Sequence, residues 1–252
     1  ISTGSLMAVA GVLCAKFITG QITLGGGSIL LAMLAGLLAA TLLGALNGAL
    51  IAQFKIQPII VTLVLYIAGR GVAQLMSNGT TLVFYNTPFN DLGVMRLFGQ
   101  MPLQLLLEII FVAVFALLLK KTTFGYYVQG IGENEKAATL SGIRTKMVLI
   151  AVYAISGFMA GCAGLMTSAR ACCADPNTLG SLAEMDAIAA VAIGGTSMSG
   201  GKARIMGTVF GALIIQLITM TINMNNIHYA YARILKGLII VIAVYVQREK
   251  KR

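Results

Sequence analysis

QGIGENEKAATLSGIRTK, residues 129–146, separates two strongly apolar segments. PLQLLLEIIFVAVFALLLKK (residues 102–121) stands before it, and MVLIAVYAISGFMAGCAGLM (residues 147–166) follows it. Each flanking segment is long enough to cross a bilayer, which takes about 20 helical residues. The quoted stretch is therefore a polar connection between two expected membrane helices, and this arrangement indicates a polytopic helical bundle.

The polar stretch itself predicts a short helix with both ends marked. Asn134 is a suitable N-cap, and Glu135 stands in the first turn, where the helix dipole favours an anion. Gly142 stands where a left-handed C-terminal cap belongs. Two turns of helix are too short to be stable alone in water, so this helix must pack on something, unless the stretch is only an ordinary loop between membrane helices. Its small apolar face consists of Ala137, Ala138 and Leu140.

The composition independently indicates a membrane protein. Of the 252 residues, 58% are hydrophobic and 10% are charged, whereas soluble domains carry about 25% charged residues. The 29 glycines agree with this class, because glycine lets membrane helices approach closely. The predicted fold is all-α, a polytopic transmembrane helical bundle, with residues 1–252 forming a single transmembrane domain.

The net charge of +10 does not predict a nucleic-acid partner. The basic residues stand at the ends of apolar segments rather than in one patch, and no nucleic-acid-binding motif accompanies them. If the polar loop at residues 120–147 is cytoplasmic, twelve of the 18 Lys and Arg residues fall on that side, as the positive-inside rule requires. The count assumes that a short apolar segment at Ala187 returns the chain to the cytoplasmic side.

The sequence lacks the motifs of an enzyme or a metalloprotein. It has one His and contains no GxSxG, HExxH or CxxC pattern, so we expect no catalytic residue, metal site or cofactor. The nearest match to a phosphate-binding loop is TSMSGGKA, in which Thr196 replaces the first glycine and Ala203 replaces the hydroxyl residue. Energy for any transport must therefore come from a partner or from an ion gradient.

Two further features concern packing and a possible pore. Gly36, Ala40, Gly44 and Gly48 recur every four residues, which predicts a face for close helix contact. Asn47 stands beside this face. A buried amide needs a partner, so Asn47 either forms an interhelical hydrogen bond or faces the pore.

The segment from Ala187 to Met198 is apolar but short. Twelve helical residues span roughly 18 Å, less than the ~30 Å hydrocarbon core. Short apolar segments interrupted by glycine indicate broken helices beside a transport path, although a short helix buried by its neighbours is the alternative. Flexible backbone and hydroxyl groups follow at Gly194, Gly195, Thr196 and Ser197.

Three stretches resemble one family. The pattern GxxExAAxLSGI at residues 132–143 is similar to the cytoplasmic coupling segment of bacterial ABC importer permeases, in the ribose/monosaccharide branch. GALNGALIAQFKIQPIIVTL (Gly44 to Leu63) and DAIAAVAIGGTSMSGGKARIMGTVFGAL (Asp186 to Leu213) resemble two further signatures of that family. One departure is Pro58-Ile59-Ile60, where the family usually has Pro-Phe-Ile.

The resemblance implies a type II ABC-importer-like permease with broken or short helices and a cytoplasmic coupling helix in the loop at residues 120–147. Such a permease moves a monosaccharide by alternating access across the bacterial inner membrane, surrounded by lipid. Its implied partners are ATP-binding cassette ATPase subunits, which bind the ATP, an extracytoplasmic sugar-binding protein and a second permease chain. One or two N-terminal membrane helices are expected to be missing from the numbered chain. The implied ATPase-coupling residues are Gly132, Asn134, Glu135, Ala137, Ala138, Leu140, Ser141, Gly142 and Ile143. The candidate translocation-path residues, which come from the buried amide and the short apolar segment described above, are Asn47, Gly194, Gly195, Thr196 and Ser197.

The alternative function is a secondary transporter or channel driven by an ion gradient. It would need charged groups at membrane depth, and Glu108 is the candidate, although it lies only about two turns from the start of its helix. An intramembrane enzyme would need a nucleophile and a base, and the sequence shows no such set. Ribose, galactofuranose, autoinducer-2 and inositol all remain open as substrates, with branched-chain amino acids as a minor alternative.

Overall fold

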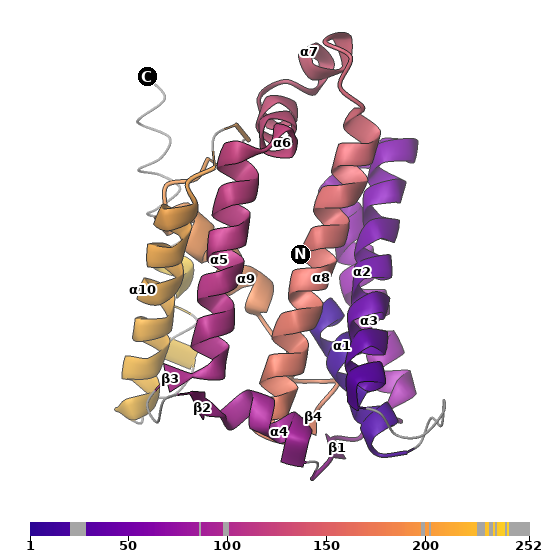
Figure 1. Ribbon diagram of the computed structural model, residues 1–252, viewed down its shortest axis with the longest axis vertical. Coiled ribbons are helices and arrows are strands. Elements are labelled where there is room, and N and C mark those ends of the chain that lie inside the picture. The colour runs from indigo at the N-terminus through magenta and orange to yellow at the C-terminus, as the bar shows by residue number, and fades with distance from the viewer. Residues whose placement is uncertain are drawn as a thin grey trace. The chain divides into compact units, whose positions relative to one another are not determined.

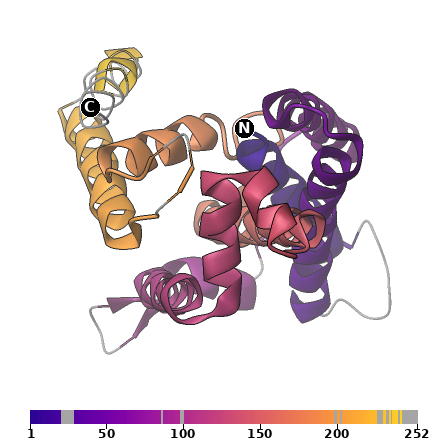
Figure 2. The same ribbon diagram turned by 90° about the horizontal axis from the view of Figure 1, so that it is seen from above.

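The computed structural model describes residues 1–20, 29–85, 87–97, 101–197, 200–201, 203–225, 230–231, 234, 236–239 and 241. The chain divides into two compact units, which are considered separately below. Unit 1 comprises Ile1–Phe115 and Arg144–Ser181, and unit 2 comprises Ala116–Ile143 and Leu182–Arg252. Among the described residues, five helices are long and apolar enough to cross a membrane. Figures 1 and 2 show the helices from two directions. The prediction of an all-α polytopic bundle is confirmed.

Unit 1 contains most of the long helices, and their ends agree with the sequence prediction within a few residues. The third helix begins at Pro58, as predicted, because a proline in the first turn removes no helical hydrogen bond. A helix at residues 87–94 was not predicted, since this part of the chain reads as a loop. The helices of unit 1 are α1 (Thr3–Ile18), α2 (Ile29–Phe54), α3 (Pro58–Met76), α4 (Thr87–Val94), the greater part of α5 (Leu103–Lys121) and α8 (Thr145–Ala171).

Two small antiparallel ladders hold the helix ends of unit 1. β1 (Leu82–Val83) pairs with β4 (Cys173–Ala174), so that the chain beyond α3 is tied to the chain beyond α8. β2 (Arg96–Leu97) pairs with β3 (Met101–Pro102) immediately before α5.

The core of unit 1 is built around α1. This helix contacts α2, α3 and α8, and ten of its 16 residues are buried. Its buried residues are mostly small, among them Ala8, Ala10 and Ala15, so neighbouring helices can approach closely. Phe89 of α4 extends the core, with its ring centroid 5.5 Å from that of Phe84.

The predicted small-residue face of α2 is confirmed: Ala40, Gly44 and Gly48 pack against α8, whereas Gly36 packs against Ala10 of α1. A Cβ added to Gly44 would lie 2.5 Å from the carbonyl oxygen of Tyr153, and one added to Gly48 would lie 2.8 Å from the Cα of Ile150. A Cβ on Gly157 of α8 would likewise lie 3.1 Å from the Cα of Gly44. Glycine is required here because the two backbones touch.

Unit 2 is built from shorter elements. The short apolar helix begins at residue 183 and ends at 193, earlier than the predicted Ala187 to Met198, because Gly194 and the left-handed Gly195 (φ 75°) end it. Eleven residues span about 16 Å, so the prediction of a helix too short to cross the membrane is confirmed. The helices of unit 2 are the end of α5, α6 (Thr123–Glu133), α7 (Glu135–Leu140), α9 (Ala183–Ile193) and α10 (Ile205–Met224).

An apolar run near the C-terminus, from Ile234 to Val246, lies largely outside the described residues. The structure describes a helical stretch at residues 236–239 and single helical positions at 234 and 241. Met198, His228 and the basic C-terminal tail also lie outside the described residues.

Candidate functional site

The short helix α7 has the boundaries that the sequence predicts. The side-chain oxygen Oδ1 of Asn134 accepts a hydrogen bond from the backbone N–H of Ala137 at 3.1 Å, which is an N-cap. Glu135 occupies the first turn, and Gly142 adopts a left-handed conformation with φ 83° just after the helix. The predicted capped helix is therefore confirmed, and its ends are fixed by local hydrogen bonds.

The predicted apolar face of α7 divides into a buried and an exposed part. Ala138 is 6% exposed, whereas Leu140 is 90% exposed. Ala137 is also exposed. Unit 2 thus supplies packing for only one of the three apolar residues, and Leu140 presents a large apolar side chain outward.

A second helix, α6, precedes α7 and was not predicted. The hydroxyl of Thr122 caps it by accepting from the N–H of Gly125 at 3.4 Å. Gly125 also sits against the backbone of Leu119, where a Cβ would lie 2.6 Å from the carbonyl carbon. The cap residue Thr122 and the close contact at Gly125 together place α6 directly after α5. Thr122 was the available sequence signal for this helix.

Within unit 2, the end of α6 meets the glycine-rich loop that connects α9 and α10. A Cβ on Gly132 would lie 2.9 Å from the backbone nitrogen of Gly201. Gly200 and Gly201 have φ values of 93° and 96°, which glycine adopts without strain. The structure thereby brings together two stretches that the sequence analysis singled out separately, 69 residues apart in the chain for Gly132 and Gly201.

The predicted path residues Gly194 to Ser197 form the turn that leaves α9. Gly194 packs on α10, where an added Cβ would lie 2.5 Å from the backbone nitrogen of Thr208. The hydroxyl of Thr196 accepts a hydrogen bond from the backbone N–H of Arg204 at 3.0 Å. This turn is therefore fixed at both ends to the first part of α10.

The fifth predicted path residue, Asn47, lies in unit 1. It is 1% exposed, and its Nδ2 donates to the hydroxyl of Ser2 at 3.3 Å. This contact is the interhelical hydrogen bond of the first interpretation. A place for Asn47 on the translocation path stays a prediction.

Unit 1 carries a fixed loop after α8 that the sequence analysis treated only as polar. Arg70 of α3 donates from Nη1 to the carbonyl oxygens of Pro176 at 2.9 Å and Leu179 at 2.7 Å. Asp175 accepts from the N–H of Asn177 at 2.9 Å and the hydroxyl of Thr178 at 2.7 Å. Slight burial raises the pKa of Asp175, but these hydrogen bonds outweigh it and hold the pKa below its usual value.

Comparison with known proteins identifies the family. The family model described as "Branched-chain amino acid transport system / permease component" matches residues 1–244. A ribose import permease protein of Haemophilus influenzae is 37% identical over 251 residues, covering 97% of this chain and 75% of that protein. A galactofuranose transporter permease protein of Escherichia coli is 34% identical over 250 residues, covering 99% of this chain and 72% of that protein.

Another relative is an L-arabinose ABC transporter permease protein of Azospirillum brasilense, which is 34% identical over 244 residues, covering 97% of this chain and 70% of that protein. No solved structure matches the chain. The family model spans nearly the whole chain, and relatives above 30% identity agree with the membrane-spanning helices of the structure. This chain therefore belongs to the branched-chain amino acid transport system / permease component family, within its group of sugar import permeases, and it is a multi-pass membrane permease subunit.

Proposed function

We propose that this permease carries a monosaccharide of the ribose or galactofuranose kind into a bacterial cell, driven by separate ATPase subunits. The observation that carries the proposal is the similarity over nearly the whole chain to relatives named for ribose, galactofuranose and L-arabinose. In this proposal, an extracytoplasmic sugar-binding protein delivers the sugar to the permease. The membrane that the permease spans is the bacterial inner membrane.

The segment from α6 to α7 is the proposed site of ATPase coupling. Its capped ends keep α7 formed although the helix has only six residues, and an element that transmits force must keep its shape. The exposed side chain of Leu140 is an anchor of suitable chemistry for a groove on another protein, since burying a leucine is worth about 1.5–3 kcal/mol. Because Gly132 contacts Gly201, a displacement of α6 would be transmitted directly to the loop before α10.

The turn at residues 194–197 is the proposed lining of the translocation path. α9 ends there after eleven residues, and short helices ending in glycine-rich turns are typical of substrate sites near the bilayer midplane. A second permease chain completes the path in this proposal. α5 supports such a partner or a lipid contact, because none of its residues is buried within the described chain.

Reconstitution tests the proposal. The permease is placed in proteoliposomes with its ATPase subunits, and uptake of radiolabelled D-ribose, D-galactose (which includes the furanose form in solution) and L-arabinose is measured with the cognate binding protein and ATP. We expect uptake of at least one sugar that depends on all three components. Uptake by the permease alone, driven by an imposed proton or sodium gradient, would support the alternative of an ion-driven transporter and overturn the proposal.

Variants of α7 test the coupling assignment. Glu135→Lys and Leu140→Asp are expected to abolish ATP-driven uptake while the protein still accumulates in the membrane, because both side chains are exposed and their loss disturbs no core. For Leu140→Asp we also expect the affinity for the ATPase to fall about 10- to 100-fold. Replacement of the buried Ala138 by a residue with a larger side chain is also expected to abolish uptake. Lys136→Ala on the same helix is the matched control, and equal uptake by all variants would refute the assignment.

A further inference from the structure

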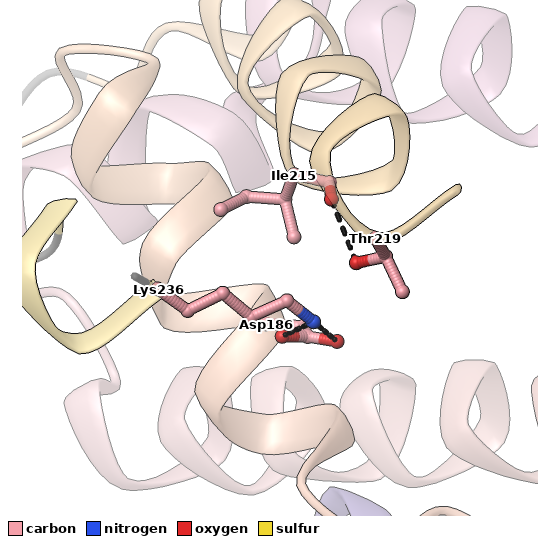
Figure 3. A network of polar contacts seen from close by, with 4 residues as sticks. All are labelled: Asp186, Ile215, Thr219 and Lys236. Atoms are coloured by element: carbon pink, nitrogen blue, oxygen red, sulfur yellow. Dashed lines mark hydrogen bonds and ion pairs between the residues drawn. The ribbon is translucent and has the colours of Figure 1, made fainter. Parts of the chain in front are cut away.

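An ion pair in unit 2 lies apart from the segments discussed so far. The ammonium group of Lys236 lies 2.8 Å and 3.0 Å from the two carboxylate oxygens of Asp186. Asp186 stands in the first turn of α9, and Lys236 belongs to the helical stretch at residues 236–239. Figure 3 shows the pair together with Ile215 and Thr219 of α10. The nitrogen–oxygen distance of 2.8 Å makes this contact a salt bridge between residues that the structure describes.

The packing of α9 against α10 fixes the depth of this pair. The two helices run antiparallel in contact, with Gly194 against Gly207 and Ala190 against Gly211. The next step of four residues places Asp186 beside Ile215, in agreement with Figure 3. Ile215 stands midway along the 20 residues of α10, one of the helices long and apolar enough to cross the membrane. The ion pair therefore lies near the middle of the bilayer.

The side chains of Asp186 and Lys236 differ in their exposed fraction, and this difference shows what kind of space lies beside Asp186. The side chain of Lys236 is 11% exposed, whereas that of Asp186 is 41% exposed. A carboxylate at this depth does not face hydrocarbon, and charged groups inside membranes face the bundle interior or a water-filled cavity. The open side of Asp186 thus indicates a polar space beside the first turn of α9.

We propose that the Asp186–Lys236 pair is a sugar-contact site on the translocation path, which receives the hydroxyl groups of a neutral polyol during transport. This inference rests on the proposed function of the chain. The paired charges cancel, so the site has no excess charge to attract an ion, yet it offers carboxylate acceptors and ammonium donors to hydroxyl groups. The N-terminal end of α9 supports the carboxylate through its dipole.

A purely structural ion pair is the competing explanation, and variants separate the two. Asp186→Asn and Lys236→Met each leave one partner without its counter-charge, and we expect both to lower membrane accumulation. The double variant Asp186→Asn/Lys236→Met removes both charges and is expected to restore accumulation. For a sugar-contact site, D-ribose, D-galactose or L-arabinose uptake by the double variant still falls at least tenfold in Vmax/KM. Full recovery of uptake together with accumulation would overturn the proposal.

Carbodiimide labelling of the wild-type protein provides a second measurement that no folding defect can obscure. The intact permease with its ATPase is incubated in nanodiscs with a water-soluble carbodiimide and glycine ethyl ester, and modified carboxyls are found by peptide mass spectrometry. Asp91 of α4 is exposed and lies outside the proposed ATPase contact, so it serves as the positive control; Glu184, 5% exposed in the same turn as Asp186, serves as the negative control. We expect at least tenfold more modification at Asp186 than at Glu184. Equal modification would overturn the proposal.

The failures of the two proposals are distinguishable. If the wild-type permease imports none of the three sugars with its ATPase and binding protein, the proposed function fails. If it imports a sugar and the double variant imports that sugar equally well, only the sugar-contact site fails. Gly237→Ala is the matched control next to Lys236, because no atom lies within 4 Å of an added Cβ there. We expect this variant to retain wild-type uptake.

Discussion

The α2–α8 contact of unit 1 and the α9–α10 contact of unit 2 use the same device, glycine against a neighbouring backbone, and differ in length. α2 and α8 have 26 and 27 residues, whereas α9 has 11. Small residues extend the first contact over about two turns of α2, from Ala40 to Gly48. The α9–α10 contact depends on Gly194, Gly207 and Gly211. The long α2–α8 contact distributes its packing over many atoms, whereas the packing of the short helix α9 on α10 depends on few atoms.

The polar groups among the packed helices also differ between the two units, since those of unit 1 are neutral and those of unit 2 are charged. Unit 1 encloses a neutral amide, Asn47, with a hydroxyl partner. Unit 2 holds a pair of charges, Asp186 and Lys236, beside the middle of α10. Neutral side-chain hydrogen bonds in membranes average about 0.6 kcal/mol, while charges at this depth are rare and functional. If the Asp186–Lys236 pair contacts the sugar as proposed above, unit 1 is organised for stability and unit 2 for the movement of a solute.

The largest effect is expected where the long contact is broken. Gly157→Leu places a branched side chain against the carbonyl group of Ala40 and the Cα of Gly44. Because backbone cannot yield as a side chain does, we expect a loss of about 3 kcal/mol in the free energy of unfolding. Thermal unfolding in detergent and the yield of monodisperse protein measure this loss.

The matched control for this variant is Gly71→Ala in α3. No atom lies within 4 Å of a Cβ added to Gly71, and alanine favours a helix over glycine by about 1 kcal/mol. We therefore expect Gly71→Ala to unfold at the same or a higher temperature than the wild type. Equal unfolding temperatures for Gly157→Leu and the wild type would show that α2 and α8 are not in the contact described.

A smaller loss of stability, with a complete loss of transport, is expected at the short contact. Gly211→Ala drives a methyl group into the carbonyl of Ala190, which moves α9 away from α10. We expect destabilisation of about 1–2 kcal/mol, because only one short helix loses its packing. Uptake of sugar should nevertheless be abolished, since the turn at Gly194 is displaced with α9. Uptake and unfolding temperature are measured on the same preparation, and a larger stability loss than in Gly157→Leu would reverse the comparison.

The sequence predicts the long elements well because their causes are local. Apolar runs of about 20 residues define the spans, and the side chain of Asn134 caps α7 within three residues of itself. The small-residue face of α2 follows from its four-residue period. Each of these features depends on neighbours within one or two helical turns.

The sequence fails to predict features that depend on distant partners or on weak local preferences. α6 contains Gly125, Gly130 and Gly132, and its propensity is low, so its formation depends on packing and on the cap at Thr122. Asp186 and Lys236 stand 50 residues apart, and no periodicity predicts that they pair. Arg70 likewise finds its carbonyl partners more than 100 residues away.

The smallest effect is expected at Asn47, and it sharpens the comparison between the polar groups of the two units. The hydrogen bond to Ser2 spans 3.3 Å between neutral groups, so a double-mutant cycle of Asn47→Ala and Ser2→Ala should give a coupling energy of about 0.6 kcal/mol. The single variants should lose stability by similar amounts, and the double variant by less than their sum. If the amide serves packing alone, Asn47→Ala and Ser2→Ala reduce uptake equally and only through stability. A loss of uptake in Asn47→Ala that exceeds the loss in Ser2→Ala at equal unfolding temperature would place Asn47 on the path, and unit 1 would then share in the transport that we propose for unit 2.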